Sequence, residues 1–251
     1  MKTKPKALVI CADGINCEEE TAHALNKAGF ETSIKLTRQI LNDPKQIKHF
    51  QIFVIPGGFS FGDEIYSGKV LSLTLEKQVM PVIMDFIDDN KIILGICNGF
   101  QVLVNLGLVP EPGLTDTCVL NHNQQHKFIN RWVNLRANHS INNPLLQNLD
   151  SFELPIRHGE GNLTLKDDNL SGLINEHAAL YYNSDVNGSF NKIAGLTNKN
   201  GNILGLMPHP EAFVTKYQHY NWSKHKDNNI PNPTPGFQIF WAELFTITYM
   251  P

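Results

Sequence analysis

The chain has 251 residues, of which 41% are hydrophobic, so it can form one large α/β domain or two small ones. A formal net charge of −3 and the lack of a basic run argue against a nucleic-acid-binding protein. No apolar stretch is long enough to cross a membrane. The four cysteines (Cys11, Cys17, Cys97 and Cys118) show no CxxC pair or metal-ligand spacing, which fits a reducing compartment, so we expect a soluble, cytoplasmic protein.

The first half of the chain alternates short apolar segments with helical ones. Asn16 and Glu19 resemble a capping box, which predicts a helix that ends near Gly29. A helical region at 70–89 contains Pro81, which must kink or split it. Buried strands are predicted at 7–12, 32–36, 51–55 and 91–96. This alternation is typical of a flavodoxin-like open sheet, mainly parallel and flanked by helices, whose ligands bind at the carboxyl ends of the strands.

The strand at 91–96 leads into a turn that carries a cysteine between two glycines. Gly95-x-Cys97-x-Gly99 has the spacing of the G-x-S-x-G nucleophile elbow, with sulfur in place of oxygen. The following helix is predicted to run to about Leu106, with Gly107 as its stop. Its N-terminal dipole favours a thiolate at Cys97. A buried structural cysteine is the alternative, but glycine at both positions favours a nucleophile.

Two further segments supply groups that such a nucleophile needs. Gly57 and Gly58 follow the strand at 51–55, and beside a cysteine elbow we interpret them as an oxyanion hole rather than an ordinary turn. The predicted donors are the N–H groups of Gly58 and of Asn98, the residue after the nucleophile. Late in the chain, Pro208-His209-Pro210-Glu211 places a carboxylate two residues from an imidazole, which predicts a base and its orienting group. A solvated loop histidine is the alternative for an isolated motif of this kind.

The second half of the chain has a different pattern of apolar residues. After 115, helical periodicity fades, so we expect an added region of antiparallel strands. Asn200-Gly201 predicts a hairpin between two of them. Strands are predicted at 132–135, 152–156, 178–182, 193–197 and 203–207, a short helix at about 169–176 and a last helix at 237 to about 245.

The segment 217–235 is polar and rich in aromatic residues and proline, and we interpret it as a surface insertion in a single domain spanning 1–251. His219 and His225 suggest a metal site, but no carboxylate or cysteine in the segment completes a plausible ligand set, so no metal is predicted. The chain also has no G-x-x-x-x-G-K-[ST] phosphate loop and no G-x-G-x-x-G after its first strand. We therefore expect no nucleotide cofactor on this chain.

These motifs together resemble the class I, or triad-type, glutamine amidotransferases. GxCxG, PGG and a late HxE fit several members of that family. The more specific segments are similar to the glutaminase subunits of phosphoribosylformylglycinamidine synthase: GINCEEETAHAL (14–25), GGFSFGD (57–63), GICNGFQ (95–101), FINRWVNLR (128–136), LPIRHGEG (154–161) and the stretch 187–211. The resemblance covers about residues 6–214 and the final helix, and leaves 217–235 unmatched.

The resemblance implies hydrolysis of L-glutamine by a Cys97–His209–Glu211 triad, with the oxyanion held by Gly58 and Asn98. It also implies that Gln101 holds the amino-acid end of glutamine and that the loop of His158 and Gly159, with Glu160, lines the pocket. The ammonia would pass to a synthetase subunit that uses ATP and Mg²⁺ to aminate formylglycinamide ribonucleotide in purine biosynthesis, together with a small accessory subunit. Three alternatives stay open: the glutaminase subunit of another amidotransferase, a free-standing cysteine hydrolase on the same fold, and a non-catalytic binding module.

Overall fold

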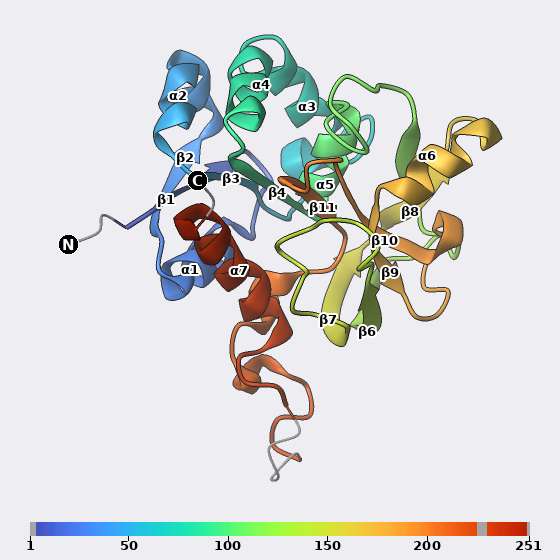
Figure 1. Ribbon diagram of the computed structural model, residues 1–251. Coiled ribbons are helices and arrows are strands. Elements are labelled where there is room, and N and C mark those ends of the chain that lie inside the picture. The colour runs from blue at the N-terminus through green and yellow to red at the C-terminus, as the bar shows by residue number, and fades with distance from the viewer. Residues whose placement is uncertain (1–3, 225–229, 250–251) are drawn as a thin grey trace.

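A computed structural model describes residues 4–224 and 230–249, and the side chains of all of these except 243–249 (Figure 1). The strands and longer helices are β1 (Lys6–Cys11), α1 (Glu18–Ala28), β2 (Glu31–Leu36), α2 (Thr37–Asn42), β3 (Ile52–Ile55), α3 (Lys69–Glu76), α4 (Met80–Asp88), β4 (Ile92–Ile96), α5 (Asn98–Asn105), β5 (Cys118–His122), β6 (Ile129–Ala137), β7 (Ser151–His158), β8 (Glu160–Leu165), α6 (Ser171–Glu176), β9 (Ala178–Tyr182), β10 (Ile193–Thr197), β11 (Ile203–Leu206) and α7 (Pro235–Tyr249).

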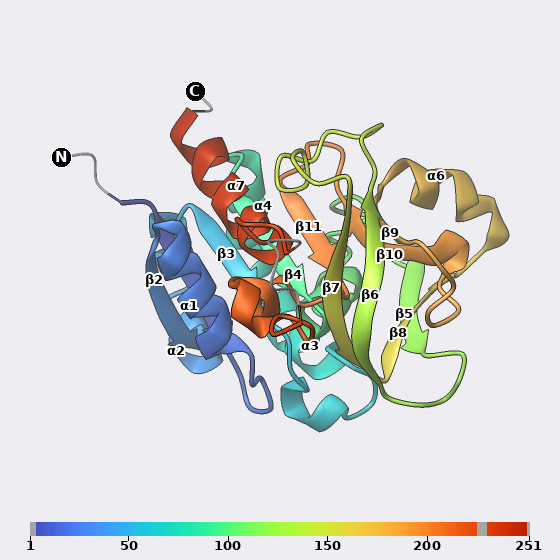
Figure 2. The same ribbon diagram turned by 90° about the horizontal axis from the view of Figure 1, so that it is seen from below.

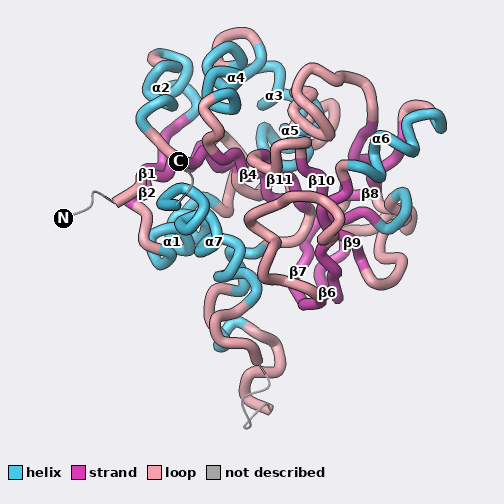
Figure 3. The backbone as a smooth tube through the Cα atoms, in the orientation of Figure 1, coloured by secondary structure: helices cyan, strands magenta, loops and turns pink. Residues whose placement is uncertain are grey.

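One nine-stranded mixed sheet runs through the molecule in the order β2-β1-β3-β4-β11-β10-β9-β6-β7. The neighbours from β2 to β11 pair parallel, and those from β11 to β7 pair antiparallel. Helices α1 and α7 lie on one side of the parallel part, and α3, α4 and α5 lie on the other (Figures 1 and 3). The predicted fold, a mainly parallel open sheet with an antiparallel addition, is confirmed.

The antiparallel part continues the sheet beyond β11, and its last strand, β7, also contacts α7. Strands β6 and β7 stand at its far edge, and β5 pairs with β8 in a separate small sheet beside them (Figure 2). The hairpin of β10 and β11 turns at Gly201, as predicted from Asn200-Gly201. Strands β5 and β8 and helix α2 were not predicted. The apolar run of β5 is confined to 118–120, β8 begins with Glu160, Gly161 and Asn162, and α2 has only six residues, so none of the three has a long apolar pattern.

Local signals set several boundaries. Pro81 lies in the first turn of α4 and separates it from α3, as predicted. Gly29 ends α1 in the left-handed conformation with a φ of 112°. The predicted capping box is wrong: the N-cap of α1 is Cys17, and no side chain caps it. The three glutamates in the first turn complement the helix dipole instead.

No helix in the described part of the chain is both long and apolar enough to span a membrane. That residues 1–251 form a single domain, with an insertion at 217–235, stays a prediction, and residues 225–229 of that segment lie outside the described ranges. Tyr217, Tyr220 and Trp222 are exposed there, whereas His219 is buried, with its ring centroid 4.7 Å from that of Trp132. His219 therefore lies in a packed aromatic cluster rather than on a surface loop, which corrects the prediction for that residue, and His225 lies outside the described residues.

The packing of α5 on the sheet gives a stability prediction. A Cβ atom on Gly99 would lie 1.9 Å from the carbonyl oxygen of Ile55. We expect Gly99→Ala to lower the free energy of unfolding by about 3 kcal/mol, measured by urea denaturation. Gly172→Ala is the matched control, because nothing lies within 4 Å of its added carbon, and it should raise stability by about 0.5–1 kcal/mol. Equal stability of the two variants would contradict the close packing of α5.

Candidate active site

Three adjacent parallel strands bring the predicted catalytic segments to one edge of the sheet. Strands β3, β4 and β11 are neighbours, and their carboxyl ends lead directly into Gly57, Cys97 and His209. The loop after β1, which contains Cys17, reaches the same edge because β1 pairs parallel with β3. The topology thus explains why residues far apart in the sequence meet here.

Cys97 lies in a strained turn between β4 and α5. Its φ of 50° and ψ of −103° are unusual for a residue with a side chain. A Cβ on Gly95 would lie 2.7 Å from the carbonyl oxygen of Gly99, so neither flanking position has room for a side chain. The backbone N–H of Cys97 donates to Leu206 O at 2.7 Å, which ties the turn to β11. The structure therefore has the geometry of a nucleophile elbow at the predicted position.

His209 and Glu211 form a buried pair. The Nδ1 of His209 lies 2.5 Å from Oε1 of Glu211, and the two residues are 2% and 1% exposed. Burial alone would lower the pKa of His209, but the Glu211 carboxylate and then Cys97 raise it well above its usual range. Nε2 of His209 has no hydrogen-bond partner among the described residues, so this nitrogen is free to take a proton.

Arg157 connects this pair to the surface. Its Nη2 donates to Oε1 of Glu20 at 2.9 Å and lies 3.8 Å from Oε1 of Glu211. The backbone oxygen of the same residue lies 3.8 Å from the Cys97 sulfur and can accept from its thiol. A positive charge beside Glu211 compensates for the burial of that carboxylate.

The glycine loop after β3 is held by the loop that follows β1. Gly58 forms an isolated bridge with Ile15, and Phe59 N donates to Gly14 O at 2.8 Å. Gly58 has a φ of +144°, and a Cβ there would lie 2.7 Å from Ile15 Cα. Within 4–224 and 230–249, the N–H groups of Gly58 and Asn98 donate to no protein acceptor. Both predicted oxyanion donors are thus available for a ligand, and their role stays a prediction.

A cavity of about 210 Å³ opens beside Cys97. The predicted pocket residues Gln101, His158 and Gly159 all line it. Gln101 is already engaged: its Nε2 donates to Glu160 O at 2.5 Å, and its Oε1 accepts from Asn98 Nδ2 at 3.0 Å. Its side chain therefore supports the wall of the cavity unless these bonds exchange for bonds to a substrate.

His158 is a neutral residue of this wall. Its Nδ1 lies 2.9 Å from Oδ1 of Asn123, and burial, then the charge of His209, lower its pKa to about 3. An uncharged imidazole at this place adds no repulsion toward a charged His209.

The cavity contains one carboxylate that was not predicted as a site residue. Asp63 lines it together with Glu160, and its Oδ1 accepts from Asn98 Nδ2 at 3.3 Å. Burial raises the pKa of Asp63 to about 6, with Glu160 adding to the effect. Arg157 lines the same cavity, so its charged groups suit a ligand that carries both a cationic and an anionic group. The only signal in the sequence was that Asp63 ends the GGFSFGD segment.

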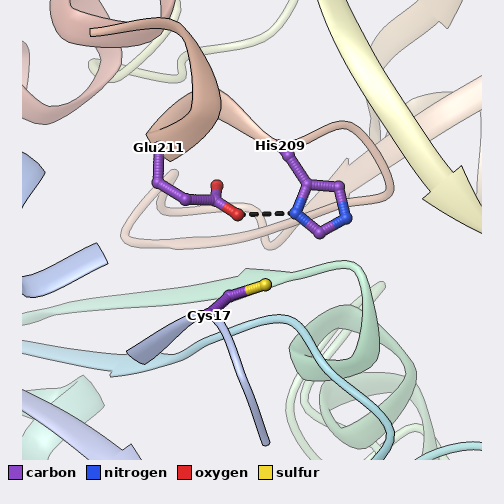
Figure 4. A group of neighbouring side chains, drawn as sticks. All are labelled: Cys17, His209 and Glu211. Atoms are coloured by element: carbon purple, nitrogen blue, oxygen red, sulfur yellow. Dashed lines mark hydrogen bonds and ion pairs between the residues drawn. The ribbon is translucent and has the colours of Figure 1, made fainter. Parts of the chain in front are cut away.

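A second cysteine also lies at this site. Cys17 is buried, and its sulfur points toward the His209 ring (Figure 4). Burial raises the pKa of Cys17 to about 11, so it is a neutral thiol in the absence of a ligand that displaces its proton. No motif or spacing in the sequence indicates that Cys17 lies beside His209.

Known proteins match both the sequence and the fold of this chain over most of its length. The family model described as the CobB/CobQ-like glutamine amidotransferase domain matches residues 4–244. The chain belongs to this glutamine amidotransferase family. The resemblance to glutamine amidotransferases that the motifs predicted is therefore confirmed.

Individual relatives indicate a narrower group within this family. A protein of Methanococcus maripaludis (strain C7), named phosphoribosylformylglycinamidine synthase subunit PurQ, is 36% identical over 228 residues, which cover 84% of this chain and 83% of the relative. The protein with the same name from Dehalococcoides mccartyi is 34% identical over 251 residues, which cover 95% and 96%. A solved structure described as PurLQS from Thermotoga maritima has a chain that matches with a TM-score of 0.76 at 32% identity, covering 96% of this chain and 98% of that one.

The free Nε2 of His209 gives a reactivity prediction. Without this base, the Cys97 thiol must lose its proton to solvent, so His209→Ala should slow alkylation of Cys97 by iodoacetamide by about 10²-fold or more. Glu211→Gln should slow it less, because the base remains present. The rate is measured by peptide mass spectrometry.

The control is His139→Ala. His139 and Asp150 form the same kind of pair at 2.7 Å on the surface, so its loss should leave the rate unchanged. Wild-type rates in all three variants would mean that His209 does not act on Cys97.

Proposed function

We propose that this chain is the glutaminase subunit of a phosphoribosylformylglycinamidine synthase. The observation that carries the proposal is the placement of Cys97 in an elbow at the strand edge that also carries the His209–Glu211 pair, 2.5 Å apart. The PurQ relatives of Methanococcus maripaludis and Dehalococcoides mccartyi support the choice of synthase, since they match over most of both chains. We expect the protein to act in the cytoplasm.

Hydrolysis begins when Cys97 attacks the side-chain amide carbon of L-glutamine. His209 takes the thiol proton at Nε2, a carbon–sulfur bond forms, and the carbonyl electrons move to oxygen. The N–H groups of Gly58 and Asn98 hold this oxyanion. The tetrahedral intermediate collapses as His209 gives the proton to the departing nitrogen, which leaves as ammonia. Water then hydrolyses the γ-glutamyl thioester to glutamate, with His209 again as the base, and Glu211 holds the ring throughout.

The carboxylates of the cavity recognise the other end of the substrate. Glutamine carries an α-ammonium group, and Asp63 with Glu160 provides negative charge for it. Gln101 and Gly159 also line the cavity, and we expect them to contact the amino-acid end once the bonds of Gln101 to Asn98 and Glu160 exchange for bonds to the substrate. Phe59 and Phe128, whose ring centroids are 6.2 Å apart, are exposed residues of the cavity lining.

The ammonia passes to a synthetase subunit that converts formylglycinamide ribonucleotide to formylglycinamidine ribonucleotide. That subunit would bind ATP and Mg²⁺, and this chain needs no cofactor for its own half-reaction. The similarity to a chain of the solved structure described as PurLQS from Thermotoga maritima supports a synthetase partner, and we expect a small accessory subunit as well.

The first test separates the two half-reactions. In a complex with its synthetase, Cys97→Ala should abolish amination with glutamine, a loss of at least about 10³-fold, because no thioester can form. Amination with ammonium chloride should be unchanged, since free ammonia bypasses this chain. The product is measured by liquid chromatography.

Two results would contradict the proposal. Retained glutamine-dependent turnover in Cys97→Ala would exclude Cys97 as the nucleophile. Full glutamine hydrolysis by the chain alone, with no amination when the synthetase is added, would indicate a free-standing hydrolase.

Substrate recognition gives a prediction of pH dependence. Asp63 binds an ammonium group only when ionised, and its pKa is about 6. As the pH falls through that value, Asp63 gains a proton, so the KM for glutamine should rise while the substrate ammonium stays charged. Asp63→Asn should raise the KM about tenfold at neutral pH and remove most of this pH dependence.

Asparagine suits the positive φ of 54° at position 63, so the variant should fold. The matched control is Glu64→Gln, since Glu64 is the exposed neighbouring acid. A pH profile of the KM that is identical in wild type and Asp63→Asn would exclude Asp63 from substrate binding.

A further inference from the structure

Cys17 lies beside the His209–Glu211 pair, and the hydrolysis of glutamine does not use it. It comes from a different part of the chain, the loop between β1 and α1, and is 4% exposed. Its backbone N–H donates to Gly57 O at 3.3 Å, which fixes the loop against the glycine turn. Figure 4 shows its sulfur directed at the same side of the imidazole ring as Glu211.

The three side chains place three different donor atoms close together. The Cys17 sulfur, a ring nitrogen of His209 and a carboxylate oxygen of Glu211 all lie within 4.8 Å of one another. A Cβ built on Gly57 would lie 3.3 Å from both the Cys17 sulfur and the Nδ1 of His209. The sulfur and the Nδ1 edge therefore border one small space, which exists because residue 57 has no side chain.

The charge and hydrogen bonding of the cluster leave room for a cation. Oε2 of Glu211 is buried and has no partner among the described residues, so it can bind an ion while the Arg157 side chain stays near Oε1. A thiolate and a carboxylate together carry the charge that a divalent cation neutralises.

We propose that Cys17, His209 and Glu211 form a binding site for a thiophilic divalent cation of the Zn²⁺ type, which inhibits the enzyme when occupied. Sulfur, imidazole and carboxylate are the three ligand types that Zn²⁺ takes in proteins. With Zn–S near 2.3 Å and Zn–N near 2.0 Å, donors around a tetrahedral ion lie about 3.5 Å apart, so these side chains need to move by about 1 Å. The fourth position would hold water.

Occupation of the site would disable the base. Binding at Nδ1 replaces the proton that His209 shares with Glu211, and the Cys17 thiol also releases its proton. The remaining ring proton then resides on Nε2, which cannot accept another from Cys97. The binding of the cation is independent of the proposed function, and only its inhibitory effect depends on glutamine hydrolysis.

The binding test uses Co²⁺, a spectroscopic substitute for Zn²⁺, and a chain without the competing thiol of Cys97. Cys97→Ala protein should show thiolate-to-cobalt charge-transfer absorption in the near ultraviolet that saturates at one ion per chain and disappears when Zn²⁺ is added. The absorption should be lost in Cys97→Ala/Cys17→Ser. It should persist in Cys97→Ala/Cys11→Ser, because Cys11 is not part of the cluster. Cys11 is the matched control, since its sulfur also lies near a carboxylate, 3.7 Å from Oε1 of Glu18.

Either of two results overturns the site: no such absorption in Cys97→Ala, or undiminished absorption when Cys17 is also removed. Thermal unfolding without metal shows whether each variant is folded, and Cys17→Ala replaces Cys17→Ser if the serine variant is not.

The inhibition test uses chains that retain Cys97. Zn²⁺ should inhibit wild-type glutamine hydrolysis, and a chelator should restore it. Cys17→Ser should raise the Zn²⁺ concentration for half-inhibition by about tenfold or more, relative to its own metal-free rate, whereas Cys11→Ser should not. Equal inhibition of wild type and Cys17→Ser would assign the inhibition to Cys97 and contradict the inhibitory role.

Discussion

The close approach of α5 to β3 and β4 is the constraint on which the site depends. Gly99 lies against the backbone of Ile55, and the strand turns into the helix within one residue, Cys97. This residue accepts a φ of 50° because the bond from Cys97 N to Leu206 O and the packing on both sides determine its backbone. The parallel ladders of β4 with β3 and β11 fix the spacing of these strands, and so place the sulfur near the segments that follow β3 and β11.

A second feature is the way in which charge is buried beside the sulfur. Glu211 is almost fully enclosed, and it is tolerated because His209 lies on one side and Arg157 on another. The pKa of His209 is raised by this carboxylate despite burial, so the ring readily holds a proton taken from a thiol. The cavity beside Cys97 carries charges of both signs: Asp63 and Glu160 line it together with Arg157. These groups match a ligand that has a cationic and an anionic group at one end, as an amino acid has.

The sequence predicted the parts of the fold and site that are set by local pattern. Gly95-x-Cys97-x-Gly99 implies an elbow because no other residue type fits so close a turn, and β9 and β10 have the predicted bounds because their apolar runs are continuous. Strands β5 and β8 were missed because their apolar residues are few, and they pair only with each other in a small separate sheet. The capping box failed because the chain before α1 bonds to the glycine turn through Cys17 N instead.

Contacts between segments far apart in the chain could not be predicted from local sequence patterns. Asp63 becomes a pocket residue only when α5 places Asn98 beside it, and Cys17 reaches His209 only because β1 lies next to β3 in the sheet. Neither spacing nor periodicity records which strands are neighbours. The identity of the nucleophile could be argued from the sequence, but the position of Asp63 in the cavity and of the Cys17 thiol beside His209 required the three-dimensional structure.

The central claim is that Cys97 forms a covalent bond to the side-chain carbon of glutamine. The most direct measurement is labelling by a diazoketone analogue of glutamine, followed by intact and peptide mass spectrometry. The claim predicts one adduct per chain, located on Cys97, prevented by excess glutamine and absent from Cys97→Ala. An adduct on Cys17, Cys11 or Cys118, or labelling of Cys97 that glutamine does not prevent, would contradict it.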